Sequence, residues 1–357
     1  MLIVTTAISG SDRKGYLLRF EEFARKNGKK IKIYHVGQMM FEHAHSIGIN
    51  FTPENVLNAP PAVINAVRSA VFEKIASELP KVLKQHHAVF INIHAMFFWR
   101  KVFVRAWDNY YVSQLNPDLF LAFVDDVISI NKQLKSRKQW KRENLTIGDT
   151  LLWRNVDVEM TASWAEMSRK KFCVIPSPSK EKLLYRMLFE SHLEKVYAAM
   201  PLTNFTGAKD QAEVDKFIAK LEKYFIVIDP REIELVEQWK PYMRTDAVLH
   251  QIVNRDLYWL IKQVDRVIAY FPKAVSSPGV VNELREAHET NKEAWLVYPK
   301  GAAISPFLTY YSNMVFHGPN ELFRFLATQK GNGSSGTAES ASKADKKSRK
   351  KRRKETA

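Results

Sequence analysis

The residues of this sequence that are best placed to do chemistry form the pattern Ser277-x-Gly279-x-x-x-Glu283, which follows an apolar run at 266–271. The run predicts a buried strand, and the Ser, Pro and Gly residues after it predict a turn into a helix that opens at Gly279. Ligands of open α/β sheets bind beyond the carboxyl ends of the strands, and a helix N-terminus offers free N–H groups to an anion. We therefore expect Ser277 and Gly279 to hold an anionic group, and Glu283 to face the same crevice.

A second carboxylate, Asp256, opens another predicted helix at 256–263. Two carboxylates in one cleft can divide into a nucleophile and a general acid or base, which makes Glu283 and Asp256 candidate catalytic residues. Each also has a plainer interpretation. A Ser or Gly before a helix with Glu in its first turns is ordinary capping chemistry, and Asp256 is a good N-cap residue.

The segment 195–327 resembles the nucleoside 2-deoxyribosyltransferase family, and within it the 2′-deoxynucleoside 5′-phosphate N-hydrolases. Ser277-x-Gly279-x-x-x-Glu283 matches the S/D-x-G-x-x-x-E signature of the family. Asp256, in Asp-x-x-Trp-Leu, stands where the family has its second acidic residue, and Tyr197, in Val-Tyr-Ala-Ala-Met-Pro, matches its opening strand. The resemblance implies that Glu283 attacks C1′ of the sugar and that Tyr197 lines the sugar pocket.

The same resemblance implies a substrate and an assembly. Ser at position 277 looks like the branch that accepts a 5′-phosphate, whereas Pro201 and Thr203 stand where that branch has Ser and Arg. Ser305 lies near a segment that reaches a neighbouring subunit's site in family dimers, so we expect a homo-oligomer. The implied activity is cleavage of a nucleotide or nucleoside N-glycosidic bond, or deoxyribosyl transfer, with no cofactor required.

The N-terminal strand expected at 2–6 runs into Ala7-Ile-Ser-Gly-Ser-Asp-Arg-Lys-Gly-Tyr16, which has the context of a phosphate-binding loop. A Walker A motif needs G-x-x-x-x-G-K-[ST], but Ala7 replaces its first Gly and Gly15 follows the lysine. The candidate phosphate contacts are Gly10, Ser11, Arg13 and Lys14. A solvated basic turn is an equally good interpretation of Arg13 and Lys14.

Residues 1–175 resemble P-loop nucleoside-monophosphate kinases, especially the archaeal type of adenylate kinase. The resemblance rests on segments such as 36–44 and 90–94, and Asn92 stands where such kinases tend to have Asp. We expect a degenerate domain that serves as a nucleotide-binding or regulatory scaffold, with a protein partner as a further candidate ligand. Mg²⁺ and ATP are expected only if this domain still binds nucleotide. The alternatives are an active nucleoside-monophosphate kinase, or a non-catalytic nucleotide-binding or assembly protein.

Strands alternate with helices in both halves of the chain, which predicts two parallel-sheet α/β domains. The first is expected to be P-loop-kinase-like and the second Rossmann-like, of the flavodoxin-like kind. Pro176-Ser-Pro-Ser179 indicates a linker. The predicted organisation is a first domain at 1–175, a linker at 176–194, a second domain at 195–330 and a disordered basic tail at 331–357.

The charge of the chain is uneven. The 357 residues carry 54 Lys and Arg against 38 Asp and Glu, a net charge of +16. Of this excess, +6 falls in 331–357, where a basic run suits either a solubilising tail or nucleic-acid binding. A single cysteine excludes an internal disulfide framework and a cysteine-based zinc site, and no apolar run is long enough to predict a membrane span. We expect a cytoplasmic protein without membrane contact.

Aromatic and basic residues interleave between positions 99 and 111. They are Trp99, Arg100, Lys101, Arg105, Trp107, Tyr110 and Tyr111. Such a mixture suits base stacking, or core packing beside a solvated basic face. The basic stretch 132–143 predicts a solvated helix or loop. The histidines form no recognisable metal-binding motif, so no metal site is expected.

Overall fold

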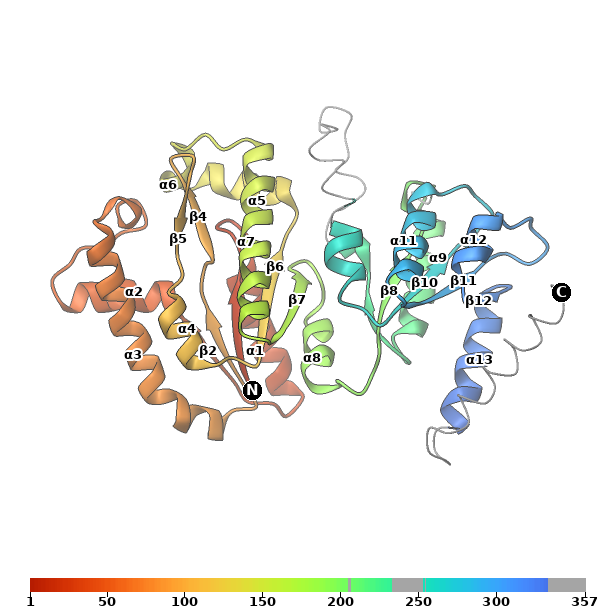
Figure 1. The fold of residues 1–357 in the computed structure, drawn as a ribbon, viewed down its shortest axis with the longest axis horizontal. Helices are drawn as coiled ribbons and strands as arrows, with labels where there is room; N and C mark the ends of the chain where they lie inside the picture. Colours follow the sequence, from red (N-terminus) through yellow and green to blue (C-terminus); the bar gives the residue numbers. More distant parts are fainter. Residues whose placement is uncertain (205–206, 233–252, 254, 333–357) are drawn as a thin grey trace.

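The computed structural model describes residues 1–204, 207–232, 253 and 255–332, and for Thr203, Asp256 and 330–332 it describes the backbone alone. These residues form two α/β units that lie side by side along the long axis of the molecule (Figure 1). Each unit is built on a five-stranded parallel sheet, so the expectation of two parallel α/β domains is confirmed.

The first unit is built on a sheet with the strand order β2-β3-β1-β6-β7. Its strands are β1 (Leu2–Thr6), β2 (Ile31–His35), β3 (Ala88–Asn92), β6 (Leu119–Val124) and β7 (Lys171–Pro176). An antiparallel hairpin, β4 (Met96–Trp99) and β5 (Val102–Arg105), follows β3. The helices are α1 (Arg13–Lys26), α2 (Val36–Ser46), α3 (Pro61–Gln85), α4 (Asn109–Leu115), α5 (Val127–Ser136), α6 (Lys138–Lys141), α7 (Ile147–Met167) and α8 (Glu181–Phe189).

The inner strands of the first sheet, β3, β1 and β6, are buried on both faces, which explains their largely apolar runs. Along β1, Ile3 packs with helices α1 and α8, whereas its neighbour Val4 packs with α3, α4 and α7. This alternation is the period-two pattern of a strand that has helices on both sides. The carboxyl ends of the strands are left open, and that edge is where the candidate phosphate loop lies.

The second unit has the strand order β12-β11-β10-β8-β9, in which the first strand of the unit has the second on one side and the third on the other. This is the strand order of flavodoxin-like doubly wound sheets. Its strands are β8 (Lys195–Ala199), β9 (Ile226–Ile228), β10 (Arg266–Tyr270), β11 (Glu293–Val297) and β12 (Met314–Phe316). The helices are α9 (Ala208–Leu221), the π-helical turn η6 (Arg255–Ile261), α11 (Pro278–Glu289), α12 (Pro306–Tyr311) and α13 (Pro319–Asn332), with short 3₁₀ turns at Leu202–Asn204 and Pro230–Glu232.

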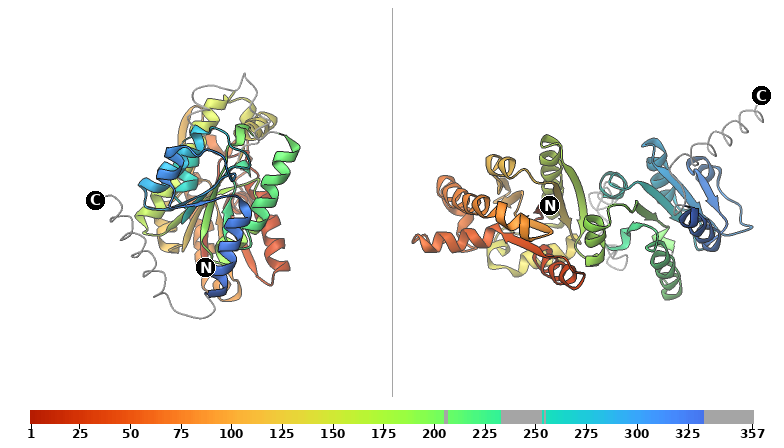
Figure 2. Two further views of the ribbon diagram at one scale, coloured as in Figure 1. Left: turned by 90° about the vertical axis from the view of Figure 1, so that its right-hand side faces the viewer. Right: turned by 90° about the horizontal axis from the view of Figure 1, so that it is seen from below.

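The two units share one hydrophobic cluster. Val124 and Val174, at the β6–β7 edge of the first sheet, belong to the same core as Trp259 and Leu284 of the second unit. A side-chain amide closes this junction: Gln263 accepts a 2.8 Å hydrogen bond from the Val174 N–H and donates a 3.0 Å bond to its carbonyl. The units therefore meet over buried apolar surface. The right-hand view of Figure 2 shows the two units following one another along the long axis of the molecule.

Three segments differ from their sequence-based description. The stretch 176–194, expected as a linker, contains α8, whose Leu184 and Leu188 pack against the first sheet. The stretch 132–143, expected to be solvated, carries Trp140, which is buried against Trp153. The β4–β5 hairpin was not expected at all. Within the described ranges, no helix is long and apolar enough to cross a membrane.

Candidate functional site

The strand order of the second sheet reverses between β8 and β10. The candidate site lies at the carboxyl ends of these two strands. Crevices at such a reversal are the usual ligand sites of doubly wound sheets. Helix α11 begins in the connection that leaves β10, and η6 packs against it. The sequence motif that ends in Glu283 therefore lies at this edge, as expected from the order of its elements.

The structure brings Tyr197 and Glu283 into contact. The Tyr197 hydroxyl, on β8, donates a hydrogen bond of 2.8 Å to Glu283 Oε1, on α11. The Tyr197 ring is fully buried, and Val280 and Leu284 fix the inner face of α11 in the same core cluster. Both partners are thus held by packing, and a phenol that donates to a carboxylate favours its ionised form and fixes its orientation.

Ser277 and Gly279 stand at the N-terminus of α11. The Ser277 side chain caps the helix by accepting a long hydrogen bond, 3.4 Å, from the Val280 N–H. Pro278 has no N–H, and no heavy atom lies within 4 Å of a Cβ built on Gly279. The capping hydrogen bond is therefore weak and the space beside it is open. An anion could replace the Ser277 hydroxyl as the acceptor for the N–H groups at this end of α11.

The structure gives the positions of the other predicted site residues of this unit, but no contact of their side chains with Tyr197 or Glu283. Asp256 lies on η6, three positions before buried Trp259, and the side chains of Asp256 and Thr203 are outside the description. Pro201 is buried two residues beyond the end of β8. Ser305 is exposed at the start of α12, with no capping hydrogen bond from its side chain. Its predicted role at a neighbouring subunit's site stays a prediction.

A cavity of about 420 Å³ opens at the carboxyl ends of β1, β2 and β3 in the first unit. The four predicted phosphate-contact residues all line it, together with Ile8, Ser9, His35, Gly37, Gln38, Phe41, Asn92, Ile93, His94 and Arg137. Gly10 has a φ of +91°, and a Cβ there would lie 3.1 Å from the carbonyl oxygen of Ile130. The loop therefore needs glycine at this position for its own fold, because α5 passes so closely.

Arg13 has a structural role that sequence reasoning missed. Its guanidinium is buried beneath the loop and donates to the carbonyls of Thr5, at 3.4 Å, and Ile93. Asp157, on α7, is buried nearby, and desolvation raises the pKa of its carboxyl to about 6 while the positive charge of Arg13 opposes the rise. The guanidinium of Arg13 thus holds the ends of β1 and β3 together. Asp157 lies 144 positions away, so no local signal could have revealed the pair.

Carboxylates occupy the loop where a phosphate would bind. A Cβ built on Gly15 would lie 2.3 Å from Asp12 Oδ1, so the Asp12 carboxylate lies beside Gly15; it pairs with Arg19 at 2.8 Å and makes no capping hydrogen bond to α1. The Asp12 N–H donates to Asp125 Oδ2 at 3.2 Å. Lys14 lines the cavity and donates a 3.4 Å hydrogen bond to Gln38.

His94 lines the same cavity with a neutral imidazole ring. Burial and the charge of Arg13 lower the pKa of its imidazole to about 3, and its Nδ1 lies 2.7 Å from the Ala7 carbonyl oxygen. The ring is therefore neutral and holds the loop by donating to it. The position of His94, two residues beyond the strand end at Asn92, was the available sequence signal. Among the described residues, no three His, Cys, Asp or Glu side chains are grouped to bind a metal ion.

Comparison with known proteins gives structural neighbours that cover a little over a third of the chain. No protein-family model matches the chain, and a search of curated proteins found no match. A 2-deoxyribosyltransferase from Bacillus psychrosaccharolyticus aligns over 37% of this chain and 95% of its own, with 23% identity and a TM-score of 0.31. The CMP N-glycosidase of Clostridium botulinum aligns over 38% of this chain and 99% of its own, with 20% identity and a TM-score of 0.26.

Proposed function

We propose that the second unit cleaves the N-glycosidic bond of a nucleotide or nucleoside, with Glu283 as the nucleophile. The observation that carries the proposal is the contact between Tyr197 and Glu283 at the point where the strand order reverses. The buried phenol orients a carboxylate that can act as a nucleophile, and the open N-terminus of the same helix can bind an anionic group. Together they suit a sugar derivative that carries a negative charge.

The proposed reaction has two steps. The Glu283 carboxylate forms a bond to C1′ as the bond from C1′ to the base nitrogen breaks, through an oxocarbenium-like transition state that a nearby negative charge stabilises. Asp256 supplies the proton that the departing base takes up, or positions the sugar. Water then attacks C1′ of the glycosyl ester and restores the carboxylate, or a second base does so and completes a transfer. Ser277 and the N–H groups from Gly279 onward hold the 5′-phosphate.

For the first unit we propose a nucleotide-binding or regulatory scaffold that does not transfer phosphoryl groups. The departures of the loop from a Walker A motif, Ala7 and Gly15, and the burial of Arg13 support this proposal. Both features oppose phosphoryl transfer from a nucleoside triphosphate, which needs the Walker A hydroxyl for Mg²⁺ and accessible positive charge. A chain in which both sites only bind nucleotide is the competing hypothesis.

Substitution of the nucleophile tests the glycosidase proposal. The whole chain is incubated with ribo- and deoxyribonucleotides and their nucleosides, and released base is measured by chromatography. Glu283→Gln keeps the shape of the side chain and removes its charge, so base release should fall by about a thousandfold or more. Glu286→Gln, one turn further along α11, is the matched control and should release base at the wild-type rate. If Glu283→Gln remains fully active, the capping interpretation of the motif is correct.

A further inference from the structure

The β4–β5 hairpin of the first unit has one closed edge and one open edge. Helix α7 closes the β4 side, where Trp153 Nε1 donates to the Met96 carbonyl at 2.8 Å and Asp157 accepts from the Met96 N–H at 3.4 Å. β5 is the outer strand of this two-stranded sheet, and Figure 1 shows it on the side of β4 that faces away from α7. The far side of β5 is therefore the side at which a further strand can pair.

The register of the hairpin identifies the backbone groups on that side. The Ala106 N–H donates to the Ala95 carbonyl at 3.1 Å, and the next residues inward, Met96 and Arg105, are opposite each other. Hydrogen-bonded and non-hydrogen-bonded pairs alternate along an antiparallel ladder, so the N–H and C=O groups of Phe103 and Arg105 point away from β4. Within the described residues, no hydrogen bond takes up any of these groups. They form an open edge, called here the β5 edge, of the kind that strand addition uses.

A groove lies beside the β5 edge. Two hollows of about 390 and 510 Å³ form it, and they are continuous because they share Pro61, Asn65 and Arg68 from α3 and Val104 and Arg105 from β5. Neighbouring residues of a strand point to opposite faces of the sheet. Because Val104 and Arg105 line the same hollows, the groove meets β5 at its edge and not over one face only. The space along β5 is therefore open to an extended segment, with the start of α3 as the opposite wall.

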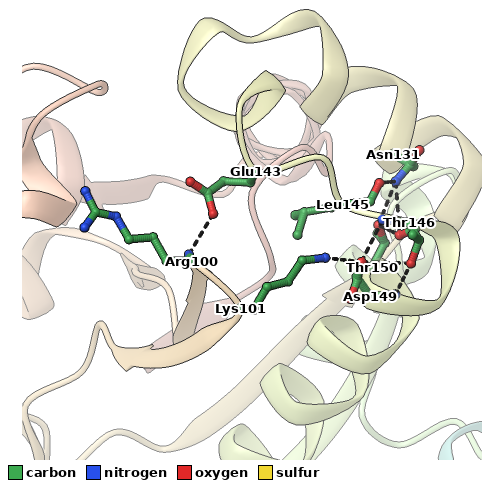
Figure 3. A network of polar contacts seen from close by, with 8 residues as sticks. All are labelled: Arg100, Lys101, Asn131, Glu143, Leu145, Thr146, Asp149 and Thr150. Carbon is green, nitrogen blue, oxygen red and sulfur yellow. Dashed lines mark hydrogen bonds and ion pairs between the residues drawn. The ribbon is translucent and has the colours of Figure 1, made fainter.

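The turn of the hairpin is fixed by contacts with distant residues. Arg100 and Lys101 connect β4 to β5 with φ angles of 51° and 60°, a conformation that usually requires Gly or Asn. The Arg100 N–H donates to Glu143 at 2.7 Å and the Lys101 ammonium pairs with Asp149, and Figure 3 shows both contacts. The hairpin is thus ordered before a ligand binds, which lowers the entropic cost of strand addition.

The charges around the groove favour an acidic partner. Arg100 and Arg105 line the groove with exposed side chains that form no ion pair with a described residue. Asp108 also lines it, but its carboxylate accepts from the Tyr110 N–H at 3.0 Å, and its charge stabilises the buried guanidinium of Arg68. The charge left unpaired in the groove is therefore positive. Pairing with the β5 edge of a second copy would bring like charges together, whereas carboxylates would offset them.

Exposed apolar side chains accompany the edge. Val102, on β5, is 62% exposed, and Tyr110 and Met167, which line the larger hollow, are 63% and 67% exposed. Single exposed apolar residues are ordinary, but these three lie on the edge strand or in the groove beside it. Trp99 and Trp107, by contrast, are 8% exposed and belong to the core. A partner strand would cover the exposed apolar side chains, so it should carry apolar residues of its own.

We propose that the β5 edge is a docking site for an extended acidic segment of a partner protein, which adds to the hairpin as a third strand. Residues directly opposite each other in an antiparallel pair interact, so the segment has apolar residues opposite Val102, Phe103 and Val104 and acidic residues on both sides of them. Its backbone pairs with the outward groups of Phe103 and Arg105, and its carboxylates pair with Arg105 and Arg100. The site lies in the first unit and does not depend on the glycosidase proposal.

The test measures binding of a fluorescein-labelled peptide, Glu-Glu-Val-Ile-Val-Glu-Glu, to the whole chain by fluorescence polarisation. Saturable binding is expected at peptide concentrations below about 1 mM. N-methylation of the three apolar residues of the peptide should abolish binding, because it removes the donors that strand pairing needs. A peptide with Lys in place of Glu should bind about tenfold more weakly or not at all, because its charges repel those of the groove.

Two variants at one position separate the charge from the backbone. Arg105→Ala removes the guanidinium and keeps the N–H, and it should weaken binding by about three- to tenfold. Arg105→Pro also removes the outward N–H, and it should weaken binding by about a further threefold or more. The hydrogen bonds between β4 and β5 do not use this N–H, and circular dichroism checks the fold of both variants. Arg25→Ala, an exposed arginine on α1, is the matched control and should leave binding unchanged.

Several results would overturn the proposal. One is the absence of saturable binding of the acidic peptide to the wild-type chain. Equal binding of the N-methylated peptide, or of Arg105→Pro and Arg105→Ala, would show that no strand is added, and equal binding of the Lys peptide would show that charge does not select the partner. A dimer in sedimentation that Arg105→Pro dissociates would assign the β5 edge to a second copy of the chain. A single-stranded oligonucleotide that requires Arg105, when the acidic peptide does not bind, would make the groove a nucleic-acid surface.

Discussion

Tyr197→Phe removes one oxygen atom from the proposed site and leaves the buried ring in place. The lost interaction is the 2.8 Å hydrogen bond to Glu283 Oε1. Hydrogen bonds to charged groups contribute about 1.5 to 3 kcal/mol. If the bond persists in the transition state, kcat/KM should therefore fall by about 10- to 100-fold. The loss is smaller than for Glu283→Gln because the nucleophile itself remains.

The pH dependence gives a second readout of the same substitution. The phenol stabilises the ionised carboxylate, so its removal makes Glu283 harder to ionise. The acid limb of the kcat/KM profile, which reports the ionisation of the free enzyme, should move to higher pH in Tyr197→Phe. A purely structural hydrogen bond would not produce this shift.

The chain offers a matched control on the opposite face of the same sheet. Tyr270, on β10, donates a 3.0 Å hydrogen bond to Glu213 Oε1, on α9. Tyr270→Phe should lower the midpoint of urea unfolding about as much as Tyr197→Phe does, with no change in base release. The reasoning is refuted if the two variants lose activity equally, or if Tyr197→Phe loses stability and keeps the wild-type rate and pH profile.

Three further outcomes are expected. Incubation with ATP, Mg²⁺ and each nucleoside monophosphate should yield no diphosphate above background, because Gly15 replaces the Walker A hydroxyl residue and Arg13 is buried. Magnesium-dependent phosphoryl transfer would contradict the scaffold proposal. Burial, and then the charge of Asp229, raise the pKa of Glu232 to about 7, so the native state keeps a proton that the unfolded chain releases near pH 4.5. Stability should thus fall between pH 5 and 7, by up to about 3 kcal/mol, and urea titrations of Glu232→Gln should show a smaller fall; an equal fall would show that other groups cause it. Phe307 and Tyr310 are 62% and 71% exposed on α12, and we expect them to contact a second copy of the chain. Light scattering should show a dimer, and replacement of both residues by Ser should give a monomer. A wild-type protein that is monomeric and active would exclude a site shared between subunits.

The sequence predicted the two parallel sheets because their strands are buried on both faces and follow strong local patterns. The motif resemblance also predicted one site for Tyr197 and Glu283. It could not give their 2.8 Å contact, which depends on how α11 packs through Val280 and Leu284.

Other features had no local signal. The Arg100-Lys101 turn lacks the Gly or Asn that would mark a two-residue hairpin, because contacts with Glu143 and Asp149, some forty residues later, hold it. The lysines and arginines around Trp140 predicted solvation, yet the single ring is buried among distant aromatic side chains. In each case tertiary contacts overrode local propensity.

The hydrogen bonds of Gln263 to Val174 have a consequence for dissection of the chain. Val174 lies in β7, at an open edge of the first sheet, and the amide takes up the outward N–H and carbonyl that a further strand would otherwise pair with. Unpaired edges of this kind recruit strands from other molecules. Cutting the chain after α8 would expose this edge together with the apolar surface of Val124. A first unit produced alone is therefore expected to aggregate through β7. Ligand binding measured on that fragment would then reflect its aggregation and not the properties of its binding site.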